Sequence, residues 1–348
     1  MSAQTAIIAA LISALLFGAS TPLAKLLLGD VAPILLAGLL YLGSGLGLTL
    51  LRLARDRGLA APRLAAREWP WLLGAIACGG VVGPVLLMYG LTRTSAANAS
   101  LLLNLEAVFS ALLAWIVFRE NAGRRVVLGM ALIVAGGAML AWSPGAMLAG
   151  AAPGAIAIAG AGLCWGLDNN LTRKVAGSDA LFIAAIKGLV AGITNCALAI
   201  ALGASLPPLP LIGAAMTVGL LGYGVSLVLY ILALRGLGSA RASAYFSTAP
   251  FLGAAVAILL LHEPAAAAFW LSALLMAAGV WLHLSERHEH DHSHEAQSHE
   301  HLHVHDEHHQ HQHELARDGA EPHSHPHHHP PLRHRHHHYP DLHHRHRH

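Results

Sequence analysis

The feature that most limits the fold of this chain is a series of apolar runs that fills residues 1–284. Each run is about 20 residues long, enough for a helix to cross the ~30 Å hydrocarbon core of a bilayer. Backbone amides in lipid must be hydrogen-bonded within the protein, and the runs lack the alternation of barrel strands. We therefore predict ten helical spans, over residues 5–28, 31–53, 69–92, 95–118, 126–142, 153–173, 180–202, 211–234, 243–261 and 268–284.

Charge and histidine divide the chain into two regions. Only 11% of the residues are charged, against about 25% in an ordinary soluble domain. Residues 1–284 contain two of the 27 histidines, and residues 285–348 contain the other 25. The sequence thus predicts an apolar body and a polar tail. Three cysteines lie within apolar runs and are interpreted as packing residues, not as a disulfide framework: Cys78, Cys164 and Cys196.

The distribution of Lys and Arg predicts the orientation of the spans. Basic residues gather in the loops after the second, fourth, sixth and eighth spans, while the intervening loops are nearly bare apart from Arg93. Basic loops stay on the cytoplasmic side. The amino terminus, the even-numbered loops and the tail are therefore expected in the cytoplasm, with the body in the inner (plasma) membrane as a multi-pass protein.

The body contains an internal repeat. Residues 17–25 match residues 165–173 in an aromatic-Gly pair, a small polar cluster, a Leu and a terminal base, and residues 100–120 match residues 243–263 without a gap. We predict two five-helix halves, 1–142 and 153–284, followed by the tail, 285–348. Because five is odd, the second half enters the bilayer from the opposite side. Inverted repeats of this kind are typical of secondary transporters.

On these residues the chain resembles the EamA-like branch of the drug/metabolite transporter superfamily. The resemblance rests on Phe17-Gly18…Pro22…Lys25 with its second copy, and on the repeated helix that ends in Glu120 and Glu263. It covers the body and none of the tail. It implies an exporter of metabolites or related solutes, with a central cavity and no ATP-binding domain. One position departs from the family, because Ala107 replaces a proline that members often carry in the fourth helix.

Three charged residues, Glu106, Asp168 and Lys187, lie well inside predicted spans, where a charge costs roughly 2.5–3.5 kcal/mol near the helix centre. Glu106 and Asp168 are predicted to line the translocation path, where they would bind a cationic substrate or carry a coupling proton. An ion pair between Asp168 and Lys187 is the alternative for those two residues. No transport role is assigned to Lys25, which lies close enough to a helix end to extend its amine outwards.

Neighbouring amides extend this polar region. Asn169 belongs to the same patch of the sixth span as Asp168. Asn104 is two residues before Glu106, about 200° around a helix, so one of the two packs between helices while the other faces the path. Small-xxx-small pairs are interpreted as packing contacts between helices: Gly79/Gly83, Gly162/Gly166 and Gly188/Gly192. Three prolines are expected to kink their helices: Pro22, Pro84 and Pro250.

The tail has no apolar periodicity and is predicted to be disordered and histidine-rich. Imidazole suits Zn, Cu and Ni, so the tail is expected to bind divalent metal. The candidate ligands are His288, His290, His292, His294, His299, His301, His303 and His305. Two stretches match HExxH, but that motif indicates a protease only on an ordered helix, and no other catalytic motif occurs. The chain is therefore not predicted to be an enzyme and requires no cofactor.

Three functions remain open. The preferred one is export of a divalent metal ion such as Ni, Co or Zn, with the tail as cytoplasmic collector or sensor. The second is export of an organic metabolite or drug by the same body, with a tail that only buffers metal. The third is a membrane metal buffer or sensor without transport, which would not need an internal repeat. The expected partners are the substrate and the lipid bilayer; a homodimer is compatible with the sequence, and nucleic acid is not expected.

Overall fold

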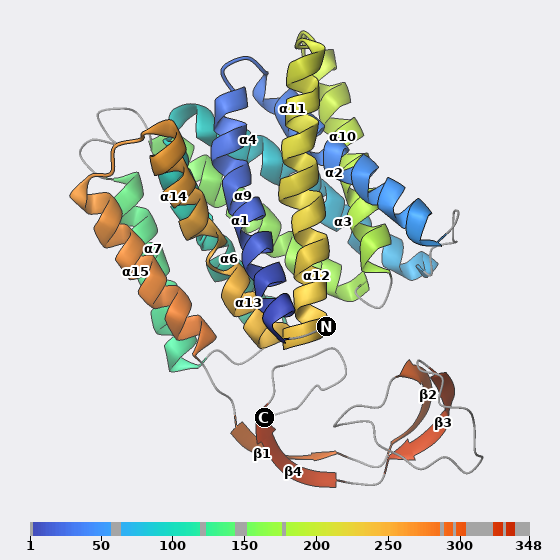
Figure 1. Ribbon diagram of the computed structural model, residues 1–348. Coiled ribbons are helices and arrows are strands. Elements are labelled where there is room, and N and C mark those ends of the chain that lie inside the picture. Colours follow the sequence, from blue (N-terminus) through green and yellow to red (C-terminus); the bar gives the residue numbers. More distant parts are fainter. Residues whose placement is uncertain are drawn as a thin grey trace. The chain divides into compact units, whose positions relative to one another are not determined.

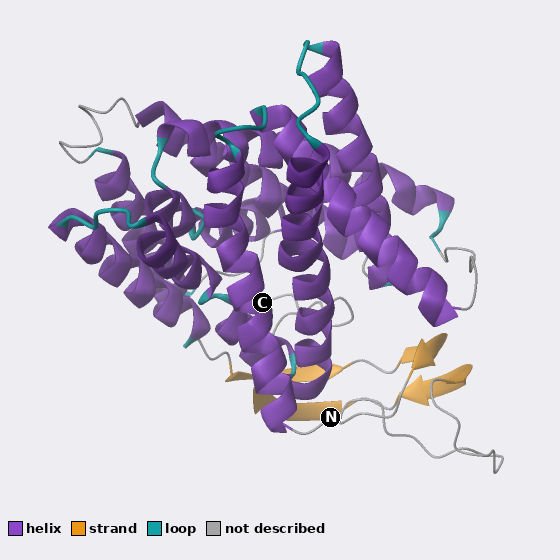
Figure 2. Cartoon of the chain, turned by 45° about the horizontal axis from the view of Figure 1, so that its top comes forward, coloured by secondary structure: helices purple, strands orange, loops and turns teal. Residues whose placement is uncertain are grey.

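The computed structural model describes residues 3–56, 64–118, 123–142, 152–175 and 179–285, and four strands further along the chain. It divides into two units, residues 1–286 and 287–348. In the first unit every element described is helical, with short connections between the helices (Figure 2).

The helices of the first half are α1 (Ala3–Leu27), α2 (Pro33–Asp56), η1 (Ala66–Glu68), α3 (Trp69–Ala75), η2 (Ile76–Val82), α4 (Gly83–Arg93), α5 (Ala96–Leu102), α6 (Leu105–Phe118) and α7 (Arg124–Ala141). Those of the second half are α9 (Ala152–Thr172), η3 (Arg173–Val175), α10 (Ala180–Ala201), α11 (Leu209–Gly219), η4 (Leu220–Val225), α12 (Ser226–Leu237), α13 (Ser239–Phe246), α14 (Ala249–Leu261) and α15 (Ala267–Leu284).

These helices follow the predicted spans closely. Nine segments of the described residues are long and apolar enough to cross a membrane. The remaining predicted span, 153–173, is the helix α9, whose cluster of Asp168, Asn169 and Asn170 lowers its hydropathy. The first unit is thus the all-helical body of a multi-pass membrane protein.

Two spans in each half are irregular in the middle, at equivalent places. The third and the eighth spans contain π-helical segments, η2 and η4. The fourth and the ninth spans are broken by a turn, between α5 and α6 and between α13 and α14. Pro84 lies in the first turn of α4, after η2, and Pro250 lies in the first turn of α14, after the break that follows α13; at these positions a missing amide costs little. The segments that follow the break before α6 and the π-helical segment η4 contain no proline.

The first helix of each half packs against helices of the other half. α1 lies against α12 and α14 of the second half, and α9 lies in the same way against α4 and α6 of the first half. Two further pairs join equivalent helices of the two halves: α2 packs along α10, and α7 packs along α15 at one edge of the bundle (Figure 1). Each half therefore completes the core of the other.

Glycines set the distance between α2 and α10. A Cβ added to Gly188 would lie 2.7 Å from the Cα of Gly45, and one added to Gly192 would lie 2.7 Å from the Cα of Leu42. Such contacts let two backbones approach closely, as in other membrane helix pairs. The predicted packing role of the Gly188/Gly192 pair agrees with this geometry.

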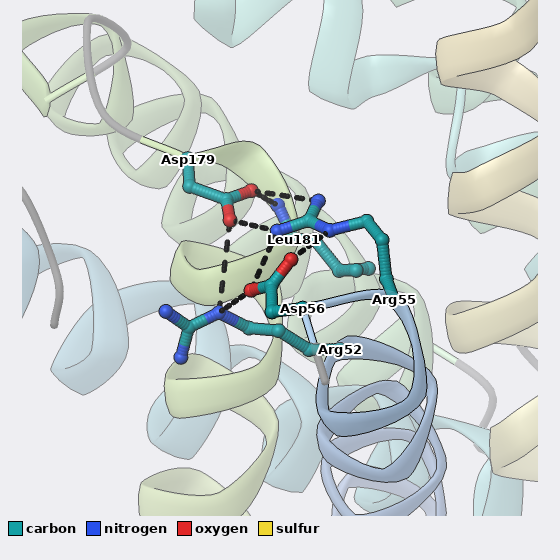
Figure 3. Close-up of polar contacts among 5 residues, drawn as sticks. All are labelled: Arg52, Arg55, Asp56, Asp179 and Leu181. Atoms are coloured by element: carbon teal, nitrogen blue, oxygen red, sulfur yellow. Dashed lines mark hydrogen bonds and ion pairs between the residues drawn. The ribbon is translucent and has the colours of Figure 1, made fainter. Parts of the chain in front are cut away.

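A cluster of charges joins the same two helices at one end (Figure 3). Asp179, the N-cap of α10, accepts a hydrogen bond from the Leu181 amide at 2.9 Å. It also forms ion pairs with Arg52 and Arg55 of α2. Burial acts to raise the pKa of Asp179, but the hydrogen bonds from Arg55 and the Leu181 amide outweigh it and hold that pKa below its usual value. The stability that Asp179 contributes is therefore present at neutral pH and is lost as the pH falls through this lowered pKa.

Tryptophans mark the ends of the spans. Six of the seven are exposed, and most of these lie near the end of a helical span, as expected for residues at a membrane interface: Trp69, Trp71, Trp115, Trp142, Trp270 and Trp281. The seventh, Trp165, lies inside the bundle.

The second unit differs from the predicted disordered tail in having short strands. They are β1 (Glu289–His294), β2 (Gln297–His303), β3 (His323–His329) and β4 (Leu332–His337). β1 pairs with β4 and β2 with β3, both antiparallel. Strand pairing lets the backbone N–H and C=O groups of these residues bond to one another. It needs no apolar core, and the polar composition of the tail could not supply one. Isolated two-stranded ribbons are marginally stable at best in water.

The glycine contacts between α2 and α10 predict a position-specific effect on stability. Gly188→Ala is expected to lower the free energy of unfolding by about 1–3 kcal/mol, because the added methyl group overlaps the Gly45 backbone. Gly213→Ala in α11 is the matched control, because a Cβ there meets nothing within 4 Å. Thermal unfolding of the two purified variants in detergent measures the difference; equal midpoints would contradict this account of the interface.

Candidate transport site

The break in the fourth span positions the carboxylate of Glu106. After α5 ends, the Asn104 side chain donates a hydrogen bond to the Leu101 carbonyl at 2.9 Å, and the chain restarts as α6 at Leu105. Asn104 is buried, whereas Glu106 is partly exposed. The two side chains therefore lie in different environments, as their spacing predicts, and Asn104 stabilises the break.

Glu106 faces α9. The Asn169 amide donates to the Glu106 carboxylate at 2.9 Å and lies 3.4 Å from the Ser110 hydroxyl. Gly162 and Gly166 make this approach possible, because added Cβ atoms would lie 3.2 Å from the Glu106 nitrogen and 3.0 Å from the Ser110 nitrogen. Among the residues that the structure describes, Glu106 has no ion-pair partner.

The exposure of this pair is informative because both side chains lie within spans. Asn169 is exposed and Glu106 partly exposed. A carboxylate and an amide are costly to place against hydrocarbon, and such groups in membrane proteins face the protein interior or water. The exposed face of the pair is therefore a candidate position for a water-accessible path.

Asp168 has a different environment, although it adjoins Asn169 in sequence. Its carboxylate pairs with the Lys187 ammonium of α10 at 2.5 Å and accepts from the Thr172 hydroxyl at 2.9 Å. Asp168 is 7% exposed and packs against Gly79, where any Cβ would overlap its carboxylate. The structure thus contains the ion pair that the sequence left as the alternative for Asp168 and Lys187.

Side chains that the sequence analysis did not single out surround the π-helical segment η2. The Tyr41 hydroxyl and the Trp165 indole both donate to the Gly79 carbonyl, at 2.8 and 2.9 Å. Asn195 donates to the Gly80 carbonyl at 3.2 Å. These donors satisfy carbonyls in a segment that departs from regular α-helix. A Gly-Gly pair inside an apolar run is the only sequence signal for such a segment.

Aromatic rings lie next to these groups. Tyr41 and Tyr223 have ring centroids 5.4 Å apart, and Phe17 contacts Tyr223 and Phe246 at 6.0 and 5.3 Å. The Tyr41 hydroxyl is within electrostatic range of the Glu106 and Asp168 carboxylates. The polar groups of α6 and α9 thus border an aromatic cluster contributed by both halves.

The repeat provides an uncharged counterpart of the site. In the sequence matches, Ala249 is the equivalent of Glu106, and Ser20 is the equivalent of Asp168. The contacts are equivalent too: Gly18 packs on the backbone at Ala249 as Gly166 packs on α6, and Gly222 packs on Ser20 as Gly79 packs on Asp168. One backbone frame therefore occurs twice, with charges in only one copy.

The structure assigns no metal centre to the described residues, among which no three His, Cys, Asp or Glu side chains are placed to share an ion. Of the predicted tail ligands, His288 and His305 lie outside the described residues, and the other six lie on β1 and β2. Metal binding by the tail therefore stays a prediction.

Spans in two equivalent halves, with an intramembrane carboxylate between helices of different halves, define a multi-pass membrane transporter. The EamA-like transporter family model matches residues 4–142 and again 152–285, so the chain belongs to that family of drug/metabolite transporters. It is a transporter and not an enzyme, and the predicted family and repeated domain are confirmed.

Two individual similarities agree with this assignment. The chain is 28% identical over 281 residues to an "Uncharacterized transporter" of Methanothermobacter thermautotrophicus, across 76% of this chain and 82% of the relative. A protein of known crystal structure shares the fold with a TM-score of 0.58 and 20% identity, across 79% of this chain and 95% of that one.

The contacts of Asp168 and Lys187 predict strong coupling between them. Asp168→Asn or Lys187→Gln alone is expected to lower the free energy of unfolding by about 3–5 kcal/mol, because each leaves a buried charge without its partner. The double variant is expected to lose less than the sum. Chemical unfolding of the four proteins in detergent measures the coupling energy.

The more exposed pair Arg55 and Asp179, at the end of the bundle, provides the control. The same cycle of variants there is expected to give a coupling energy of no more than about 1 kcal/mol. Additive losses for Asp168 and Lys187 would show that their contact contributes little.

Proposed function

We propose that this protein is a secondary exporter of small solutes in the inner membrane and that the solute and its coupling ion pass Glu106 and Asn169, between α6 and α9. The two halves are proposed to have opposite orientations in the bilayer, with both termini on the cytoplasmic side, as the basic loops indicate. The observation that carries the proposal is the Glu106 carboxylate, bound by the neutral amide of Asn169 on a partly exposed face within a span.

This geometry supports exchange of a solute for a proton. A carboxylate without a cationic partner among the described residues can be neutralised by a proton or by a cationic solute, but not by both together. Binding of one therefore displaces the other. In a transporter built from two repeats, the site is open to one side of the membrane at a time, and this competition then couples the two fluxes.

An organic solute fits these groups better than a metal ion does. Glu106 and Asn169 offer one carboxylate and one amide, and the adjacent aromatic faces suit an organic body, and an amine in particular. Metal selectivity among transition ions usually requires imidazole or thiolate ligands. We therefore favour an organic metabolite or drug that carries a positive charge as the substrate.

Export of a divalent metal is the second candidate, because of the 25 histidines in the tail. In that case the tail would collect or sense Ni, Co or Zn on the cytoplasmic side and pass it to the body. If the body exports organic solutes, the tail acts as a separate metal buffer.

Replacing the Glu106 carboxylate tests the site. Glu106→Gln keeps the size of the side chain and one oxygen that can accept from Asn169, but it removes the charge and the proton-binding site; it is expected to lower proton-coupled efflux by at least about tenfold. Efflux of amine-bearing solutes, and of Ni, Co and Zn in parallel, is measured from cells that express each variant. Glu68→Gln is the control, because the Glu68 carboxylate only caps η1 at the bundle surface. Full efflux by Glu106→Gln would refute the proposed site.

Removal of residues 287–348 tests the tail. If the tail collects metal for export, the truncated protein is expected to lose metal efflux and tolerance while organic efflux is unchanged. Cellular metal content after preloading, measured by mass spectrometry, gives the result. Unchanged metal efflux would separate the tail from transport and leave buffering as its role.

A further inference from the structure

The equivalent helices of the two halves do not have equivalent surroundings. α5 packs along α14, and six of its seven residues are buried. The equivalent helix α13 does not pack along α6 within the described residues, and most of its described side chains are partly exposed. Two copies of one motif are therefore in different states, one closed and one open.

The two copies of the site show the same difference. Ala249, Ser20 and Thr21, beside the closed copy, are 1%, 2% and 3% exposed. Their equivalents beside the open copy are the partly exposed Glu106, the exposed Asn169 and Asp168, which is 7% exposed in its ion pair with Lys187. Among the described residues, the Glu106 site is thus less tightly covered on the side of α13 than its equivalent is on the side of α5.

At the closed end, the Glu263 carboxylate connects the segment after α14 to α5. Glu263, in the connection after α14, accepts hydrogen bonds from the amides of Ala96 and Ala97 at 2.8 and 2.7 Å. These amides belong to the first turn of α5, where backbone donors have no intrahelical partner and a negative charge is favoured. Charge-assisted hydrogen bonds of this kind are stronger than neutral ones.

Lys25 reinforces this end from α1. Its ammonium donates to the Leu91 carbonyl in the last turn of α4 and to the Thr94 carbonyl in the connection to α5. Lys25 also lies within electrostatic range of Glu263. Its amine is therefore bound by the protein, and the sequence-based interpretation that gave Lys25 no role is incomplete.

We infer that Glu263 is a gating residue: its carboxylate holds α14 against α5 and so closes one end of the transporter, while the equivalent pair of helices, α13 and α6, closes the other end in the alternate state. The inference rests on the proposed transport function, because only a transporter needs to open its two ends in turn. Release of Glu263 from α5 is then a required step of the cycle, and Lys25 is a positioning residue for it.

The repeat identifies where the open end should close. Ser100 of α5 lies beside Gly253 of α14, since a Cβ added to Gly253 would be 3.0 Å from the Ser100 hydroxyl. The equivalent positions are Ser243 of α13 and Ser110 of α6. In the alternate state these two residues are expected to come within disulfide range.

The experiment is a disulfide cross-link in the full-length protein, reconstituted in liposomes. Ser110→Cys and Ser243→Cys are introduced after Cys78→Ala, Cys164→Ala and Cys196→Ala. A metal-free oxidant such as diamide is used, because the tail is rich in histidine. We expect slow cross-linking, detected by mass spectrometry of peptides. Glu263→Gln should accelerate it by about fivefold or more, the lower end of typical coupling between sites, because loosening one end favours closure of the other.

Controls make each outcome decisive. Lys25→Gln is expected to accelerate cross-linking as well, and Glu68→Gln to leave it unchanged, with the elution profile of each variant showing that it is folded. Absence of the disulfide in every variant, or equal rates with and without Glu263→Gln, would overturn the inference. Cross-linking requires no substrate, so its result is independent of the effect of Glu106→Gln on efflux, which decides the proposed function.

Discussion

The requirement that backbone polar groups be satisfied inside a bilayer governs this structure. Regular helices meet it within themselves, yet four spans of this protein are irregular in the middle. The irregular segment η2 is stable because Tyr41 and Trp165 donate to the Gly79 carbonyl and Asn195 donates to the Gly80 carbonyl. Each donor comes from a different neighbouring helix. The irregular backbone and the packing around it therefore depend on each other.

Close packing on glycine then determines where the polar side chains of α9 lie. Three successive residues, about 100° apart around the helix, have different partners. Asp168 pairs with Lys187 of α10, Asn169 with Glu106 of α6, and Asn170 with the carbonyls of Gly166 and Ser110. A patch that is continuous in sequence is thus divided in space between an ion pair, a candidate binding group and a structural hydrogen bond.

Much of this architecture could be predicted from the sequence, because hydropathy and helical geometry act locally. The spans, the repeat and the separation of Asn104 from Glu106 are of this kind. The break before α6 was not predicted, because it lacks the proline that accompanies its equivalent at Pro250 and depends on the Asn104 amide instead. The contacts of Lys25, Tyr41 and Glu263 were also not predicted, since they join residues far apart in the chain and have no periodic signal.

On the proposed function, the restriction of charge to one copy of the site would give the transport cycle a physical means of coupling. At the open end Glu106 is partly exposed, so water can solvate its carboxylate. Closure of α13 against α6 would bury that carboxylate, and burying an unpaired ion costs several kcal/mol. Closure therefore requires that a proton or a cationic solute neutralise Glu106 first. At the equivalent position Ala249 carries no charge, so the other end can close without a ligand. In the proposed cycle, the asymmetry between Glu106 and Ala249 would make only one of the two closures dependent on binding.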